Sequence, residues 1–296
     1  MKRAVIYLGY QCNNYCRFCT NLGGRQIYRT TSEIKKEIIL AHQHKNTILD
    51  FIGGEPTIRP DFIDLIKFAG ELRFQGISLT TNGRMFSYYE FAKKMARLNL
   101  TEIIFSIHGP NAKIHNFLTR VPDSFEQTLR GINNLRKLGL ENIKSNTVIV
   151  KQNYQYLPEI AKFLKNRGVK SSEFTFLDTS TGGAHRYFKN LVPQISLVAP
   201  KLKTCLSLNR ENTVANFPLC HFNKYLNQVR ELIRMKIPMQ SRHFIGSSEI
   251  NMDQYRSKNL KVKTKKCINC KLNNLCEGIS KEYYQYYGDE ELNPII

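Results

Sequence analysis

The first 178 residues alternate between two patterns of apolar positions. Short apolar runs predict strands, and apolar residues that recur every three or four positions predict helices. The six predicted strands are residues 4–8, 48–52, 76–81, 102–107, 146–150 and 173–177. Predicted helices begin near Ser32, Pro60, Ser87, Ser124 and Pro158. The best marked helix is the fourth, because Ser124 and Gln127 have the spacing of a capping box and Gly139 can end it.

This alternation predicts parallel βαβ units with right-handed crossovers. Six units are too few for a closed eight-stranded barrel, so we expect an α/β fold, a partial (β/α)6 barrel. Ligands of such folds gather at the C-terminal ends of the strands. The segments that follow strand ends, and are therefore expected to line one mouth, are 12–19, 53–56, 81–83, 106–109 and Asn153.

The pattern changes after residue 178. Residues 179–184 are small and polar, 190–212 look irregular with two prolines, and 222–235 predict a helix. Residues 247–266 predict a mobile loop. We therefore expect two domains, residues 1–185 and residues 186–296, of which the second is small and cysteine-rich.

The composition narrows the class of protein. No signal peptide and no membrane-spanning apolar run are visible in the 296 residues, so a cytoplasmic protein without membrane contact is expected. The formal charge of +20 favours an acidic partner, such as nucleic acid or an acidic peptide segment. No recognisable nucleic-acid-binding module accompanies that charge.

Three cysteines directly follow the first predicted strand. Cys12, Cys16 and Cys19 are spaced by four and three residues, so one short loop can turn their thiolates toward one point. Soft sulfur ligands favour an iron–sulfur cluster or zinc, and structural sites of either kind normally take four protein ligands. Three local ligands leave one metal position open for chemistry. The alternative is a zinc knuckle whose fourth ligand lies elsewhere.

Gly53, Gly54, Glu55 and Pro56 directly follow the second predicted strand. Two adjacent glycines allow a backbone to come close to a ligand, and Glu55 offers an acceptor for an ammonium group.

The Cys-x3-Cys-x2-Cys pattern with Phe18 before its last cysteine, followed by Gly-Gly-Glu-Pro, resembles the radical S-adenosylmethionine (SAM) superfamily. The resemblance implies that the three cysteines are catalytic and hold a [4Fe-4S] cluster whose fourth iron chelates SAM. An electron from the cluster then breaks the S–C5′ bond and yields methionine and a 5′-deoxyadenosyl radical. It also implies a reducing partner such as flavodoxin or ferredoxin.

The resemblance also assigns SAM contacts to residues of this chain. Gly53, Gly54 and Glu55 would meet the amino group, and Phe18 would lie against the adenine. Ser106 and Arg120 would be polar contacts, with Arg120 facing the carboxylate. Asn82 and Asn153 are weaker candidates, and His108 and His115 stay outside the predicted site. The alternatives are a capping role for Ser106, a surface position for Arg120 and a simple turn at Asn82.

A second group of cysteines lies near the C-terminus. Its spacing resembles the auxiliary-cluster region of the SPASM and twitch subfamilies, which implies one auxiliary [4Fe-4S] cluster. The implied ligands are Cys220, Cys267, Cys270 and Cys276. A zinc ribbon at the same residues is the alternative. Cys205 either replaces one of these ligands or is a buried free thiol.

Relatives with such tails often modify ribosomally made peptides, so the expected function is a radical SAM peptide maturase. No peptide-binding domain is expected before the barrel, because the first strand begins at Ala4. One alternative is a radical SAM enzyme that modifies RNA, a nucleotide or a small molecule. A remote alternative is a non-enzymatic protein with two zinc sites. The sequence leaves open the bond that is formed and whether SAM is consumed or regenerated.

Overall fold

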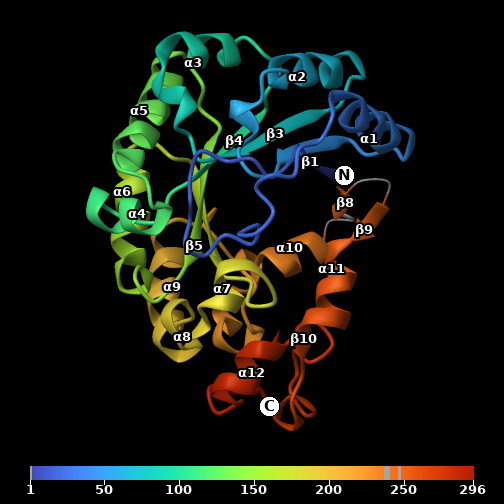
Figure 1. Cartoon of the computed structure of the whole chain (residues 1–296). Coiled ribbons are helices and arrows are strands. Elements are labelled where there is room, and N and C mark those ends of the chain that lie inside the picture. Colours follow the sequence, from blue (N-terminus) through green and yellow to red (C-terminus); the bar gives the residue numbers. More distant parts are fainter. Residues whose placement is uncertain (1, 237–240, 246–247) are drawn as a thin grey trace.

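The computed structural model describes residues 2–236, 241–245 and 248–296. Its main feature is a nine-stranded sheet with the order β7-β6-β5-β4-β3-β2-β1-β8-β9 (Figure 1). The first six strands are β1 (Arg3–Tyr7), β2 (Ile48–Ile52), β3 (Gly76–Thr81), β4 (Glu102–Ser106), β5 (Ile143–Ile149) and β6 (Ser171–Phe176). Each pairs in parallel with the next along the chain. The predicted α/β fold with parallel βαβ units is therefore confirmed.

Both edges of the sheet are extended by strands from the C-terminal third of the chain. Strand β7 (Thr213–Ala215) pairs in parallel with β6, and β8 (Ser241–Ile245) pairs in parallel with β1. Strand β9 (Ser248–Asn251) is antiparallel to β8. Residues 186–296 thus add strands to the sheet that residues 1–185 form. The division into two domains at residue 185 stays a prediction.

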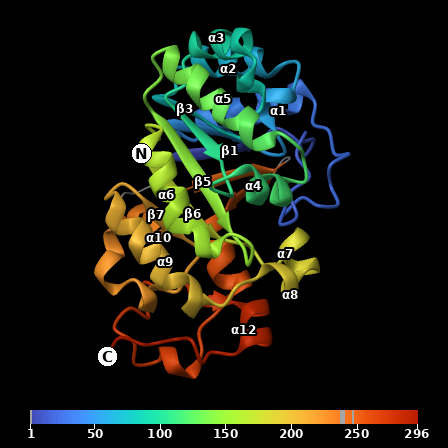
Figure 2. The ribbon, with the colours of Figure 1, turned by 90° about the vertical axis from the view of Figure 1, so that its left-hand side faces the viewer.

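Helices connect the strands and cover the sheet (Figures 1 and 2). Those of the βα units are α1 (Thr31–Gln43), α2 (Phe62–Glu71), α3 (Tyr89–Ala96), α4 (Ala112–Thr119), α5 (Ser124–Lys137) and α6 (Leu157–Asn166). Their apolar faces are buried; α2, for example, buries Phe62, Leu65, Ile66 and Ala69. Burial of such faces, rather than helix propensity, supplies most of the stability of helices in proteins.

The region after β6 adds α7 (Gly182–Arg186), α8 (Phe188–Leu191), α9 (Ile195–Leu208), α10 (Arg230–Lys236), α11 (Met252–Tyr255) and α12 (Lys281–Tyr287). A short hairpin of β10 (Lys261–Val262) and β11 (Ile279–Ser280) precedes α12. The C-terminal residues lie at the end of the molecule opposite α2 and α3 (Figures 1 and 2).

Four local predictions differ from the structure. The stretch 190–212, predicted irregular, contains α9, whose buried Val198, Leu202 and Leu206 outweigh the helix-breaking effect of Pro200. The helix predicted over 222–235 is divided, because Val229 has an extended backbone. Residues 248–262 of the predicted mobile loop form β9, α11, a π-helical turn and β10.

The fourth difference concerns the predicted capping box at Ser124. The N-cap of α5 is Asp123, and it makes no side-chain capping bond. The Ser124 hydroxyl instead donates to Asn116 Oδ1 at 2.8 Å and lies 2.7 Å from the Thr119 hydroxyl. Both partners belong to α4, a helix without a strong sequence signal. The Ser124 hydroxyl is therefore engaged with α4 and does not cap α5.

Candidate functional site

The loop with Cys12, Cys16 and Cys19 begins at the C-terminal end of β1, and all three thiols are half-buried. The loop is held by the last turn of α4. The Tyr15 N–H donates to the Thr119 carbonyl at 2.8 Å, and the Arg17 N–H donates to the Leu118 carbonyl at 2.9 Å. The first bond fixes the backbone between Cys12 and Cys16, and the second fixes it between Cys16 and Cys19.

Helix α7 holds the other side of the cysteine loop. The Gly183 N–H donates to the Cys19 carbonyl at 2.9 Å. A Cβ atom on Gly183 would lie 1.9 Å from the Arg17 carbonyl oxygen, closer than any side chain allows. Glycine is therefore required here so that α7 can close against the loop.

Burial favours the protonated form of the Cys12 and Cys16 thiols. Burial, with the nearby Glu55 carboxylate as a lesser cause, raises the pKa of Cys12 to about 11, and burial also raises the pKa of Cys16. Cys12 and Cys19 both act on the charge of Cys16, as expected for three thiols that face one point. The Asn14 N–H donates to Cys12 Sγ at 3.3 Å. Cationic iron is the natural compensation for three such thiolates, and its binding would release their protons.

The Gly-Gly-Glu segment lies directly against the start of the cysteine loop. The Gly54 N–H donates to the Gly9 carbonyl and the Glu55 N–H donates to the Gln11 carbonyl, both at 2.8 Å. A Cβ atom on Gly54 would lie 2.0 Å from the Gln11 oxygen. Among the described residues, none donates a hydrogen bond to the carbonyl oxygens of Gly53 and Gly54. Both oxygens therefore have accepting capacity beside the cysteine loop.

The Glu55 carboxylate is used differently from the sequence-based expectation of a ligand-facing acceptor. It is 2% exposed, and it accepts from the Thr57 hydroxyl and the Thr81 hydroxyl at 2.6 Å each. It also accepts from the Asn82 N–H at 2.6 Å. Burial raises the pKa of Glu55, and these hydrogen bonds oppose that shift. Its first role is therefore to tie the ends of β2 and β3 together.

The segment after β3 reaches the cysteine loop through side chains. The Asn82 amide donates to Asn13 Oδ1 at 2.6 Å and approaches Cys12 Sγ at 3.9 Å. The Arg84 guanidinium donates to the Asn13 carbonyl oxygen and to Asn14 Oδ1. Sequence reasoning named Asn82 only as a weak candidate and missed Arg84 and Asn13, which have no recognisable local pattern.

The remaining SAM candidates differ in burial and in the contacts that they make. Phe18 is buried against His108, with ring centroids 4.7 Å apart and an edge-on geometry. Ser106 is half-buried at the end of β4. Arg120 is exposed and ends α4 in a left-handed conformation, one residue after Thr119, which holds the cysteine loop. No contact of the Ser106 or Arg120 side chains ties them to the cysteine loop among the described residues.

Three further polar residues behind this mouth have structural roles. Asn153 is fully buried and donates to the His108 and Val148 carbonyls at 3.0 and 2.8 Å. His108 and His115 stack, and His115 Nδ1 accepts from the His108 N–H at 3.2 Å. Burial lowers the pKa of His115 to about 3 and holds the pKa of His108 well below its usual value. Both rings are therefore neutral, which agrees with leaving them outside the predicted site.

The four predicted auxiliary-site cysteines surround one hollow, which is also lined by Pro218, Leu272 and Pro294. Cys220, Cys267, Cys270 and Cys276 all contribute to its wall. Cys205 does not belong to this group. It is fully buried in α9, where burial raises its pKa to about 12, so it fits the alternative of a buried free thiol.

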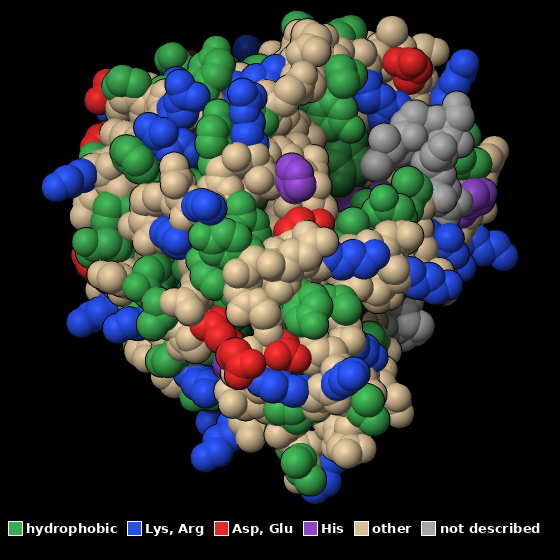
Figure 3. Space-filling model, turned by 60° about the horizontal axis from the view of Figure 1, so that its bottom comes forward, with side chains coloured by type: hydrophobic (Ala, Val, Ile, Leu, Met, Phe, Trp, Pro, Cys, Tyr) green, Lys and Arg blue, Asp and Glu red, His purple; other side chains and the backbone are tan. Residues whose placement is uncertain are grey.

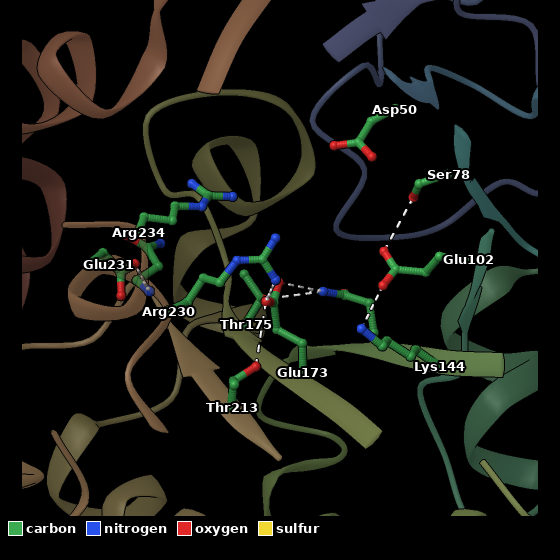
Figure 4. A network of polar contacts seen from close by, with 12 residues as sticks. Asp50, Ser78, Glu102, Lys144, Glu173, Thr175, Thr213, Arg230, Glu231 and Arg234 are labelled. Atoms are coloured by element: carbon green, nitrogen blue, oxygen red, sulfur yellow. Dashed lines mark hydrogen bonds and ion pairs between the residues drawn. The ribbon is translucent and has the colours of Figure 1, made fainter. Parts of the chain in front are cut away.

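An ion-pair network lies toward the N-terminal ends of the strands, on the face of the sheet that α10 approaches (Figure 4). Lys144 Nζ lies 2.5 Å from Glu102, whose other oxygen accepts from the Ser78 hydroxyl at 3.3 Å. Arg230 of α10 pairs with Glu173 of β6. Burial alone would raise the pKa of the Glu102 and Glu173 carboxyls. The cations beside them, Lys144 and Arg230, hold both pKa values below the usual range. The network fixes α10 to the sheet.

On the face drawn in Figure 3, Lys and Arg side chains are spread out rather than gathered into one patch. None of the helices in the described part of the chain has the length and apolar character that crossing a membrane requires.

Comparison with known proteins identifies the family. Residues 6–164, more than half of the chain, match the model of the radical SAM superfamily. The chain therefore belongs to this superfamily of enzymes, and membership implies a [4Fe-4S] cluster and SAM as cofactors. The donor set agrees with that implication, because three thiols and two accepting carbonyl oxygens lie at one mouth.

Two curated relatives show the range of proteins that share this family. The chain is 31% identical over 176 residues to the AdoMet-dependent heme synthase of Oleidesulfovibrio alaskensis, covering 58% of this chain and 44% of that one. It is 30% identical over 163 residues to the mycofactocin maturase MftC of Mycolicibacterium smegmatis, covering 54% and 41%. The chain thus spans less than half the length of these relatives.

Solved structures share the fold over nearly the whole chain. Streptococcus suis SuiB bound to the precursor peptide SuiA superposes with a TM-score of 0.67 at 15% identity, covering 94% of this chain and 71% of that one. Native anSMEcpe with bound AdoMet and the Cp18Cys peptide has a TM-score of 0.66 at 16% identity, covering 100% and 93%. At such identities the likeness concerns the fold alone.

Proposed function

We propose that this protein is a radical SAM enzyme that cleaves SAM reductively at a cluster held by Cys12, Cys16 and Cys19 and then modifies a peptide. The observation that carries the proposal is the apposition of the cysteine loop and the Gly-Gly-Glu segment, whose two backbone bonds measure 2.8 Å each. When bound, the cluster supplies the electron that cleaves SAM into methionine and a 5′-deoxyadenosyl radical. The chain's own residues hold and orient these groups.

The Gly53 and Gly54 carbonyls accept from the SAM amino group, since these oxygens have no donor among the described residues. Glu55 supports this contact mainly by positioning the segment, because three residues already donate to its carboxylate. Phe18 offers an apolar wall for the adenine. Ser106 and Arg120 are the proposed polar contacts of the outer part of SAM, and Arg120 suits its carboxylate.

Four cysteines of the tail hold an auxiliary [4Fe-4S] cluster in this proposal. The four cysteines line one hollow together with Pro218, Leu272 and Pro294, and four thiolates suit a [4Fe-4S] cluster. A flavodoxin or ferredoxin is the proposed electron donor.

A peptide is the proposed substrate class. Two solved structures with this fold hold peptides, SuiA on SuiB and Cp18Cys on anSMEcpe. The formal charge of +20 suits a peptide with acidic residues. The scattered distribution of that charge gives less support to an RNA-binding stripe (Figure 3).

The decisive test is anaerobic reconstitution with iron and sulfide, followed by iron counting and an assay for 5′-deoxyadenosine with dithionite and SAM. We expect about eight irons per chain, as two four-iron clusters require. Cys12→Ala, Cys16→Ala and Cys19→Ala should each abolish 5′-deoxyadenosine formation, whereas Cys205→Ala, outside both sites, should keep it. Formation retained in any of the first three would overturn the assignment.

The substrate class needs its own comparison. The reconstituted enzyme would receive acidic peptides, RNA or GTP, and 5′-deoxyadenosine formation would be measured at low and moderate salt. Stimulation by peptides alone supports the proposal. Stimulation by RNA that fades steeply with salt, or by GTP, would replace the peptide with a nucleic acid or a nucleotide.

A further inference from the structure

We propose that the C-terminal segment 293–295 sets the reduction potential of the auxiliary cluster by donating the Ile295 N–H to the sulfur of Cys270. The inference rests on the auxiliary cluster proposed above. It concerns a segment without cysteines, which lies outside the cysteine motif of residues 267–276.

The segment directly contacts one of the four sulfurs. The Ile295 N–H donates to Cys270 Sγ at 3.4 Å. The Ile295 carbonyl in turn accepts from the Lys271 N–H at 2.7 Å, next to Cys270. Two backbone bonds in opposite directions therefore hold the segment beside the hollow that Pro294 helps to line.

A second sulfur receives its donors from elsewhere in the chain. Cys276 Sγ accepts from the Leu219 N–H at 3.4 Å and from the Gly278 N–H at 3.3 Å. The Thr264 hydroxyl lies 4.0 Å from Cys267 Sγ. Two of the four sulfurs thus accept backbone N–H bonds, and the bond to Cys270 comes from the C-terminal segment. An N–H directed at sulfur stabilises the negative charge of a cluster-bound thiolate, and it stabilises a neutral buried thiol much less.

Donors to cluster sulfurs act on electron affinity. A reduced cluster carries one more negative charge than an oxidised one, and part of that charge resides on the ligand sulfurs. An N–H directed at sulfur stabilises the reduced form more than the oxidised form and so raises the potential. Loss of the Ile295 donor should therefore make the cluster harder to reduce.

Proline tests this without removing any cysteine, because it lacks the N–H group. We would compare Ile295→Pro with Ile295→Ala, which loses the same apolar side chain but keeps the donor. Both are made in a Cys12→Ala/Cys16→Ala/Cys19→Ala background, so that only the auxiliary cluster is observed. The readouts are iron content and the midpoint potential, measured by electron paramagnetic resonance during a redox titration.

We expect about four irons in the background and in both variants, a lower midpoint potential in Ile295→Pro and an unchanged one in Ile295→Ala. Equal potentials in all three, with iron retained, would overturn the role of the segment and leave the auxiliary cluster standing. A background that binds no iron, or zinc instead, would overturn the auxiliary cluster itself. If Ile295→Pro loses iron, an amide-to-ester replacement of the peptide bond at residue 295, which removes only the N–H, repeats the comparison, and an unchanged potential there also overturns the inference.

Discussion

The Arg84 guanidinium donates to the backbone carbonyl of Asn13, 71 residues earlier in the chain. The same nitrogen lies 3.2 Å from Asn14 Oδ1, and Arg84 Nε donates to Gln127 Oε1 at 2.6 Å. One side chain therefore joins the end of β3, the cysteine loop and α5. It also places a positive charge beside a loop that is proposed to carry three thiolates.

Removing this cation should loosen the cysteine loop. Arg84→Ala loses three charge-assisted hydrogen bonds, so we expect the free energy of unfolding to fall by about 2–3 kcal/mol. We also expect lower iron retention after reconstitution. Arg97→Ala, at an exposed position, is the matched control and should change neither quantity. Denaturant unfolding and iron counting check both; equal iron content in the two variants would speak against a role for Arg84 at the loop.

We expect that the packing of α7 against the cysteine loop tolerates no side chain at Gly183. In Gly183→Ala the new methyl group would have to displace the Arg17 carbonyl, and overpacking of this kind costs about 1–3 kcal/mol. Because the displaced backbone lies between Cys16 and Cys19, we expect loss of iron as well. Gly70→Ala in α2, where a Cβ atom meets nothing within 4 Å, should instead stabilise the helix by about 0.5–1 kcal/mol. Normal iron binding in Gly183→Ala would contradict the described closure.

The neutral His115 predicts a dependence of stability on pH. Its pKa of about 3 in the fold lies below the value of about 6.5 in an unfolded chain. Below pH 6.5 the unfolded chain therefore takes up a proton at this residue, whereas the folded chain does so only near pH 3. The contribution of the neutral ring to the free energy of unfolding is complete above pH 6.5 and is lost as the pH falls toward 3. Between pH 7.5 and pH 5 the loss from this residue should be about 2 kcal/mol.

His115→Asn keeps an acceptor near Nδ1 and does not titrate, so its free energy of unfolding should depend less on pH by that amount. His42→Asn, at an exposed position, should retain the dependence of the parent. Urea unfolding at the two pH values measures the difference. Parallel curves for His115→Asn and the parent would exclude His115 as the cause.

The Arg230–Glu173 pair predicts a non-additive effect (Figure 4). Arg230→Ala leaves the Glu173 carboxylate, whose side chain is 20% exposed, without its main partner, and we expect a loss of about 3 kcal/mol. Arg230→Met combined with Glu173→Gln removes both charges and should cost less than Arg230→Ala alone. A double-mutant cycle by thermal or denaturant unfolding gives the coupling. Additive losses would mean that the pair does not fix α10.

The sequence by itself determined the alternation of strands and helices and the two motifs of the mouth. The periodic burial of apolar residues is a local property, so six of the eight parallel strands were readable from it, whereas β7 and β8 were not. The three cysteines and the Gly-Gly-Glu segment were readable because each is contiguous and directly follows a strand. The position of parallel strand ends at one edge then placed them together.

Only the tertiary structure decided which polar groups meet. The hydrogen bond from the Thr81 hydroxyl to the Glu55 carboxylate joins residues 26 positions apart and has no signal in the sequence. Arg84 and Ile295 reach the two cysteine groups across 71 and 25 residues respectively. Such pairings depend on side chains brought together by the sheet and leave no periodic trace in the sequence. For the same reason α9 forms despite Pro200, since the surface that buries its apolar face exists only in the folded chain.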